Sequence, residues 1–333
     1  MKFSLHFLSV AILLIFSFTK INAQIKVESV ATHDSTEKKS SYFILNSNYL
    51  SNAVYSGRKD SSIVPYVRSS ISYYHKSGFY ADLGASLLVS PEDVKRIDLI
   101  TFGAGYAFKI SDKLDVDINA TKFNYTDLSY AAGSELKGIT GINLGYDAGI
   151  VSISGGAELL FSTNTDIFSS LKIARSFEIG SDNNKFTIAP TIQVNTGTQY
   201  YNQAYYSNRK YSFTTTNSNG TSTTTTTKKG HAKKSTTTTG TGGTGAGTST
   251  TTIKSINFIN KNKYTILNYE LSAPISYEYK NFGLFAIPTF AIPVNATSYE
   301  IDGALTKEKI SNTFFIEIGF SIKFPTHHKK SNK

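Results

Sequence analysis

Residues 312–324 read N-T-F-F-I-E-I-G-F-S-I-K-F. From position 314 onward every even position is apolar: Phe314, Ile316, Ile318, Phe320, Ile322 and Phe324. The odd positions are mixed and include Glu317 and Lys323. Successive side chains of a β-strand point to opposite faces. The segment therefore predicts a strand with one wholly apolar face and one mixed, charged face, followed by a basic tail that begins at Pro325.

The same alternation recurs along the chain between groups of turn residues. Twelve candidate strands follow: 41–55, 62–75, 79–89, 98–110, 114–125, 137–147, 151–161, 167–179, 186–198, 264–279, 282–293 and 313–324. Short connections, such as 76–78 and 280–281, generally alternate with longer ones, such as 199–263. Transmembrane barrels have an even strand number, short periplasmic turns and longer outer loops. We expect an all-β transmembrane antiparallel β-barrel of twelve strands, with ten and fourteen strands as alternatives.

The N-terminus has the features of a secretory signal. Lys2 supplies positive charge, residues 7–18 are almost wholly apolar, and Ala23 precedes Gln24 at a cleavage site of small residues. The apolar run is shorter than the roughly 20 residues that a membrane-spanning helix needs. We expect a cleaved signal peptide and export, with an uncleaved anchor helix as the alternative. The chain has no Cys, which excludes lipoprotein processing, a disulfide framework and a thiolate metal site.

The positive charge is concentrated in one loop. The net charge is +10, but residues 199–263 contain nine Lys or Arg and no acid. The loop includes the candidate external basic residues Arg209, Lys210, Lys228, Lys229, Lys233 and Lys234. Its middle, 214–252, is nearly all Thr, Gly, Ser and Asn with lysines, which predicts a disordered external loop. Without the signal, this loop and the tail, the rest of the chain is about −4, so we expect no nucleic-acid partner.

The expected organisation has five parts. Residues 1–23 are the signal peptide, 24–39 a periplasmic N-terminal segment, 40–324 the barrel with the loop 199–263, and 325–333 the basic tail. Five prolines interrupt the predicted strands: Pro65, Pro190, Pro274, Pro288 and Pro293. Since proline cannot donate to a strand ladder, we expect bulges or displaced boundaries there. Arg175 occupies an apolar position and predicts a bulge or rim.

The signal, the alternating strands, the aromatic end of the last strand and the absence of Cys resemble bacterial outer-membrane β-barrel proteins. Gln24 and the Tyr/Asn-rich segments, such as Tyr73–Tyr74, are similar to those of the Bacteroidota type. The resemblance covers about 40–324 and assigns no subfamily. It implies a place in the cell outer membrane among lipid and lipopolysaccharide. It also implies insertion by the barrel-assembly machinery, although the chain departs from the usual pattern by continuing to Lys333.

Charged residues on the inward parity are the candidate functional residues of the lumen. They include Arg68, Asp82, Glu158, Lys172, Glu270 and Glu317. Eight acids against four bases make the inward face about −4, which favours cations in a pore. The alternative is charge pairing inside a filled barrel, for example Glu158 opposite Lys172 in a hairpin centred at position 165. Barrels of about eight strands are filled and those of about 16–18 contain channels, so twelve leaves both interpretations open.

No catalytic residue, metal site or cofactor is expected. The one histidine in a predicted strand is His75, near a periplasmic turn, and no Ser–His pair is apparent near the outer rim. We therefore expect a protein that is not an enzyme. The leading prediction is a narrow transport or permeability pore, through which small solutes would pass. The alternative is a non-conducting structural or adhesive barrel that binds surface polysaccharide through its Thr/Lys-rich loop.

Overall fold

The computed structural model describes most of the chain from Ser40 to Thr326. The described residues are 40–59, 63–90, 95–127, 129, 131, 134–201, 212–216, 222–226, 256–259, 261–301 and 304–326. The predicted signal peptide, the periplasmic segment and the six external basic residues lie outside them, as does the basic tail after its first two residues. No helix in the described part of the chain is long and apolar enough to cross a membrane.

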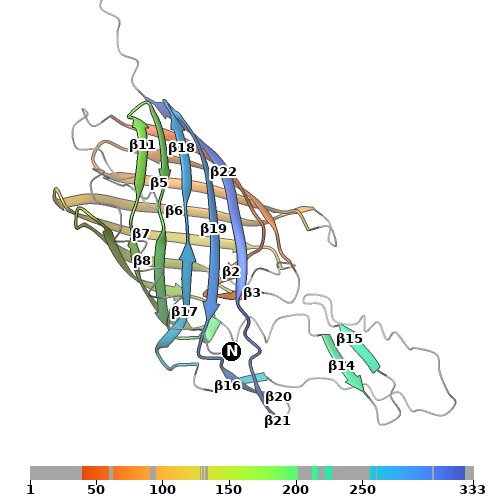
Figure 1. Cartoon of the computed structure of the whole chain (residues 1–333). Helices are drawn as coiled ribbons and strands as arrows, with labels where there is room; N and C mark the ends of the chain where they lie inside the picture. Colours follow the sequence, from red (N-terminus) through yellow and green to blue (C-terminus); the bar gives the residue numbers. More distant parts are fainter. Residues whose placement is uncertain are drawn as a thin grey trace, which may run out of the picture.

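Twelve antiparallel strands close into a barrel (Figure 1), and three of them are interrupted once and have two labels. They are β1 (Tyr42–Leu50), β4 (Tyr66–Tyr74), β5 (Phe79–Leu88), β6 (Arg96–Ser111), β7 (Leu114–Tyr125), β8 (Gly138–Asp147), β9 (Ser152–Phe161), β10 (Thr165–Ala174) with β11 (Phe177–Ser181), β12 (Asn184–Ile188) with β13 (Thr191–Gly197), β17 (Thr265–Ser272) with β18 (Ile275–Tyr279), β19 (Phe282–Pro293) and β22 (Thr313–Pro325). Pairing of β1 with β22, from Tyr42↔Pro325 to Leu50↔Glu317, closes the sheet. The predicted twelve-stranded barrel is confirmed.

The two faces of the strands differ as the alternation predicts. Large apolar side chains such as Phe102, Tyr106 and Ile318 are exposed on the outer surface. Their sequence neighbours on the other face are smaller or polar, and several are glycines. A closed barrel pairs all of its strands laterally, so an apolar outer surface suits the hydrocarbon interior of a membrane.

Interruptions of adjacent strands lie in one row across the wall. Arg175 follows β10, Pro190 separates β12 from β13, Pro274 separates β17 from β18, and Pro288 lies within β19. Each proline carbonyl accepts a hydrogen bond from the neighbouring interruption: Arg175 N to Pro190 O at 3.0 Å, Ala189 N to Pro274 O at 2.8 Å, and Ala273 N to Pro288 O at 3.2 Å. The prolines, which have no backbone N–H to donate, therefore lie where the ladder between neighbouring strands is interrupted.

The five prolines and Arg175 differ in their effect on the strands. Displaced boundaries are confirmed at Pro65, which precedes β4, and at Pro190 and Pro274. Pro288 lies inside β19, which is continuous despite it, and Pro293 is the last residue of that strand. Arg175 lies at an interruption and its guanidinium is 5.1 Å from the centroid of the Phe177 ring.

In the described part of the chain, seven short strands lie outside the barrel wall. They are β2 (Val54–Tyr55), β3 (Arg58–Lys59), β14 (Ser212–Thr216), β15 (Ser222–Thr226), β16 (Ile256–Ile259), β20 (Ser298–Ile301) and β21 (Ala304–Lys307). We call the end where β1 starts and β22 finishes the short-turn end, and the opposite one the long-loop end. Figure 1 shows β16, β20 and β21, which form one small sheet, beyond the long-loop end. β14 and β15 pair with each other inside the segment predicted to be disordered, which differs from that expectation at these strands.

Candidate functional site

The six predicted lumen residues come from six strands spaced around the barrel. Arg68 is on β4, Asp82 on β5, Glu158 on β9, Lys172 on β10, Glu270 on β17 and Glu317 on β22. Each is partly buried, whereas its sequence neighbours on the outer face are generally more exposed. Their contacts, described next, lie on the inner face of the wall.

Arg68 and Glu317 form an ion pair inside the barrel across β1. The Arg68 Nη2–Glu317 Oε2 distance is 2.5 Å. Arg68 Nε also donates to Asn48 Oδ1 on β1 at 2.9 Å. Both side chains point inward, yet they are 37% and 23% exposed. Solvent therefore reaches the inside of the barrel at this level.

The predicted pairing of Glu158 with Lys172 is wrong. Glu158 lies opposite Phe168, and Lys172 lies opposite Ser154. The turn is closed early by a hydrogen bond from Ser162 N to Asn164 O at 3.0 Å, so β10 begins at Thr165. The hairpin is therefore centred at position 163 and not at 165. The two charges are therefore separated along the strands. Glu158 and Lys172 no longer support the interpretation of a filled barrel with paired charges.

Long inward side chains lie along the wall and over glycines of the next strand. A β-carbon at Gly103 would overlap the Asp82 carboxylate, and one at Gly141 would overlap Glu158 Cγ. Gly145 leaves room for Asp115 in the same way. Because a glycine offers no side chain, the neighbouring carboxylate can lie flat on the sheet. This arrangement keeps charged groups at the wall without extending them across the lumen.

Inward tyrosines at the short-turn end also lie along the wall. Tyr42 stacks on Tyr74 with ring centroids 5.1 Å apart, and Tyr74 contacts Tyr80 at 5.5 Å. Lys323 Nζ lies 4.4 Å from the Tyr42 centroid. The row continues to β7, because Tyr80 Oη donates to Asp117 Oδ2 at 2.9 Å. These rings therefore pack against one another from strand to strand along the wall.

The lumen carboxylates fall into two groups by the donors that hold them. Among the described residues, ion pairs link Glu317 to Arg68 and Glu178 to Lys185, the latter at 3.5 Å. Asp117 instead accepts from Tyr80 and from Asn119 Nδ2, the latter at 2.7 Å. Glu270 accepts from Asn268 Nδ2 at 2.8 Å and from Asn195 Nδ2 at 3.3 Å. Neutral donors orient a carboxylate without cancelling its charge.

The long-loop end of the lumen contains a feature that sequence reasoning missed. The connection after β1 folds back as a hairpin of β2 and β3, residues 54–59, which we call the mouth hairpin. Its base is closed by Ala53 N to Val64 O and by Val64 N to Asn52 Oδ1, both at 2.8 Å. Next to this base, Leu50, Val64, Tyr66, Leu88 and Ala131 form a buried cluster.

The tip of the mouth hairpin reaches the opposite wall. Tyr55 packs against a buried cluster of Leu136, Leu160 and Tyr201. Leu160 is on β9, which is six strands from β1 in either direction around the barrel. The Tyr55 and Tyr201 rings meet edge to face at 5.0 Å. Burial raises the pKa of both phenols, so both rings stay uncharged. The mouth hairpin therefore crosses the lumen.

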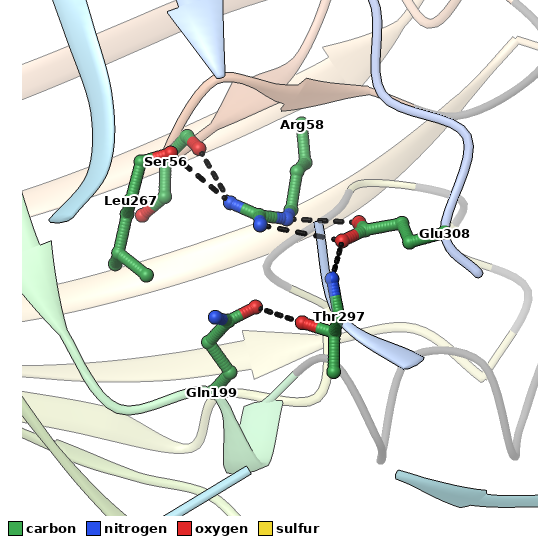
Figure 2. Close-up of polar contacts among 6 residues, drawn as sticks. All are labelled: Ser56, Arg58, Gln199, Leu267, Thr297 and Glu308. Carbon is green, nitrogen blue, oxygen red and sulfur yellow. Dashed lines mark hydrogen bonds and ion pairs between the residues drawn. The ribbon is translucent and has the colours of Figure 1, made fainter. Parts of the chain in front are cut away.

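A buried ion pair holds the mouth hairpin from the other side (Figure 2). Arg58 Nε donates to Glu308 Oε1 at 2.9 Å and Nη2 to Oε2 at 3.3 Å. Arg58 Nη1 also donates to the carbonyls of Ser56 at 3.2 Å and Leu267 at 3.5 Å. The side chains of Arg58 and Glu308 are 7% and 1% exposed. The two residues are 250 positions apart, so no local pattern could have paired them.

Glu308 also connects the mouth hairpin to the sheet beyond the long-loop end. Thr297, which precedes β20, donates from its backbone N to Glu308 Oε2 at 3.0 Å. Thr297 Oγ1 donates to Gln199 Oε1 at 2.6 Å. Figure 2 shows these contacts converging from separate segments of the chain. One carboxylate thus joins the first long connection to the last one.

Two further buried carboxylates stabilise the same end of the barrel. Asp98 accepts from Tyr66 Oη, from Thr126 Oγ1 at 2.9 Å and from Ser129 Oγ at 2.6 Å. Asp166 accepts from Thr198 Oγ1 at 2.6 Å and from the backbone N of Tyr201 at 2.7 Å. The second network positions Tyr201, against which the mouth hairpin packs.

No cluster of three or more His, Cys, Asp or Glu side chains with a metal-binding arrangement occurs in the described part of the chain. The candidate external basic residues, Arg209, Lys210, Lys228, Lys229, Lys233 and Lys234, cannot be placed because they lie outside it. The lumen and the mouth hairpin are therefore the candidate functional site.

Comparisons with known proteins find similarity in structure alone. No protein-family model matches the chain, and no curated protein matches it. The NanC porin is 12% identical over 84% of this chain and 98% of its own, with a TM-score of 0.42. The KdgM porin is 8% identical over 86% and 99%, with a TM-score of 0.37. The CymD monoaromatic hydrocarbon channel is 11% identical over 88% and 90%, with a TM-score of 0.31. Because these identities and TM-scores are low, the three structures assign no residue role and no substrate to this chain.

Proposed function

We propose that this chain is an outer-membrane barrel that acts as a narrow permeability pore. The closed barrel with its apolar outer surface supports a membrane location. The proposal includes export by the N-terminal signal, insertion by the barrel-assembly machinery, and contact with outer-membrane lipid and lipopolysaccharide. A Bacteroidota-type origin belongs to the same proposal. We propose no catalytic role.

The observation that best supports a pore is the solvent exposure of an inward ion pair. Arg68 and Glu317 remain 37% and 23% exposed although both point into the barrel. A filled interior would bury such a pair, because side chains pack at high density in protein cores. Carboxylates packed over glycines and tyrosines stacked along the wall are consistent with an interior that is not filled.

We further propose that the lumen favours cations. Two of its acids are neutralised by Arg68 and Lys185, whereas Asp117 and Glu270 are held by neutral donors. Charges that stay uncompensated at the wall of a low-dielectric tube raise the local concentration of counter-ions. Small cationic or uncharged solutes would therefore pass more readily than anions.

A second candidate function is supported by the mouth hairpin itself. A segment that crosses the lumen suits a non-conducting barrel whose external parts bind surface polysaccharide. The sheet of β16, β20 and β21 beyond the long-loop end would then present the binding surface, together with the Thr/Lys-rich loop.

Single-channel conductance of the refolded protein in a planar bilayer separates the two candidates. Stable current steps with a reversal potential toward that of the cation are the expected result for the proposed pore. A silent bilayer would contradict the pore if circular dichroism of the same sample shows an intact β-barrel. In that case the external binding function would be favoured.

A further inference from the structure

We propose that the mouth hairpin is the constriction that sets the size limit of this pore, and that the Arg58–Glu308 ion pair holds it in place. The inference rests on the proposed pore function, because a constriction has meaning only if solutes pass. It assigns a role to Arg58 and Glu308, which are not among the six predicted lumen residues. It also predicts that the pore admits small solutes and excludes larger ones.

The path of the mouth hairpin supports a constriction. It leaves the wall after β1, contacts the far wall through Tyr55, and contacts β17 and β19 through Gly57. Gly57 has a φ of +74°, and a β-carbon there would lie 2.7 Å from Asn268 Cβ and 3.2 Å from Pro293 Cβ. The backbone of the hairpin is thus in close contact with the side of the lumen that holds Glu270. Any solute moving along the lumen must pass this segment.

The mouth hairpin is separate from the wall in its backbone pairing. β2 and β3 pair with each other, in a sheet distinct from that of the barrel. β1 ends at Leu50 and β4 begins at Tyr66, and both pair along their full length with barrel neighbours. The hairpin can therefore move or be removed without loss of a barrel ladder. In the described residues, side-chain contacts and the close approach of the Gly57 backbone to Asn268, and not a strand ladder, keep the hairpin across the lumen.

The Arg58–Glu308 ion pair is the bidentate, charged contact among these side-chain contacts. Both side chains are almost wholly buried, and the guanidinium binds the carboxylate through two nitrogens. Bidentate pairs of this kind fix orientation as well as distance. Removal of one partner would leave a buried unpaired charge, which is costly, whereas removal of both leaves none. A double substitution should therefore release the hairpin with less damage to the fold than a single one.

Two variants and one control test the proposal in planar bilayers. The first variant is Arg58→Ala with Glu308→Ala, and the second replaces residues 54–59 by a short glycine linker. The control is Arg96→Gln, which removes a cation that is paired with Asp98 at the same end of the barrel. Circular dichroism verifies the barrel in each sample, and the linker variant remains informative if the double variant does not fold.

Conductance and size exclusion are measured together, with polyethylene glycols of graded size as uncharged probes. We expect both variants to conduct severalfold more than the parent protein and to admit larger polymers, while Arg96→Gln behaves like the parent. If the parent conducts and the linker variant has the same conductance and size limit, the constriction is overturned but the pore is not. If every folded sample is silent, the pore itself is overturned, and the constriction with it.

Amide hydrogen exchange supplies a readout that does not depend on conduction. The peptide that contains residues 54–59 should exchange severalfold faster in the Arg58→Ala, Glu308→Ala variant than in the parent, and no faster in Arg96→Gln. Unchanged exchange in the double variant would show that the ion pair does not hold the hairpin and would overturn that part of the proposal.

Discussion

Glu317 and Glu270 are the same residue type in the same lumen, yet their surroundings give them different roles. Glu317 is paired with a guanidinium, so the pair adds no net charge. Glu270 accepts from two asparagines, which fix its position and leave its charge in place. Glu158 lies over Gly141 on the wall. Ion preference should therefore depend on Glu158 and Glu270 and much less on Glu317.

The first prediction concerns these two acids. We expect Glu158→Gln with Glu270→Gln to move the reversal potential in a salt gradient toward zero, because two uncompensated negative charges leave the lumen. The shift should be larger at low ionic strength, where screening is weaker. The matched control is Arg68→Gln with Glu317→Gln, which leaves the net lumen charge unchanged. Equal effects of the two double variants would contradict the distinction between paired and unpaired acids.

At the scale of the element, β22 separates two environments within one strand. Its even positions face outward, and Ile318 near its middle pairs with Tyr49 of β1 and Ala286 of β19. Its odd positions face the lumen, where Ser321 lies opposite Gly283. A strand with a period of two is the simplest structure that meets both environments at once.

The second prediction uses that difference between the faces of β22. Ile318→Arg should destabilise the folded protein in lipid vesicles by about 2–4 kcal/mol, the cost of a charge near the middle of the bilayer. Ser321→Arg, three residues away on the lumen face, should have a much smaller effect on stability. Urea titration of the vesicle-inserted protein measures both. Similar losses for the two variants would contradict the assignment of the faces.

At the scale of the whole molecule, the barrel and its external strands are separate units of pairing. β14 and β15 pair with each other, and β16, β20 and β21 form a third sheet. The barrel ladder continues on either side of the long connection, through β13 paired with β17. A long insertion at this point is tolerated because the entropy of closing a loop grows slowly with its length.

The third prediction follows from that separation. Deletion of residues 214–252 should leave the circular dichroism spectrum, the resistance to urea and any conductance unchanged. Loss of binding to surface polysaccharide in the same variant would support the alternative function. Loss of the barrel itself would show that the segment stabilises the wall, contrary to the pairing pattern.

The sequence by itself determined the barrel, its strands and the faces of those strands. Alternation along 312–324 and eleven similar segments is a local property, and each strand must place apolar side chains toward lipid. The inward positions of Arg68, Asp82 and Glu270 follow from the same parity. Prolines at 190 and 274 also marked where strands are interrupted, because proline cannot donate a ladder hydrogen bond.

Only the tertiary structure decided which residues meet inside and across the lumen. The opposition of Glu158 to Phe168 depends on a turn centred at position 163, two residues earlier than the centre at 165 that would pair Glu158 with Lys172. The mouth hairpin crosses to β9, and Arg58 meets Glu308 across 250 residues. Such contacts have no period along the chain, because they arise between segments that closure of the barrel brings together. Periodicity reports which face a residue occupies, whereas contacts across the lumen depend on the path of the loops.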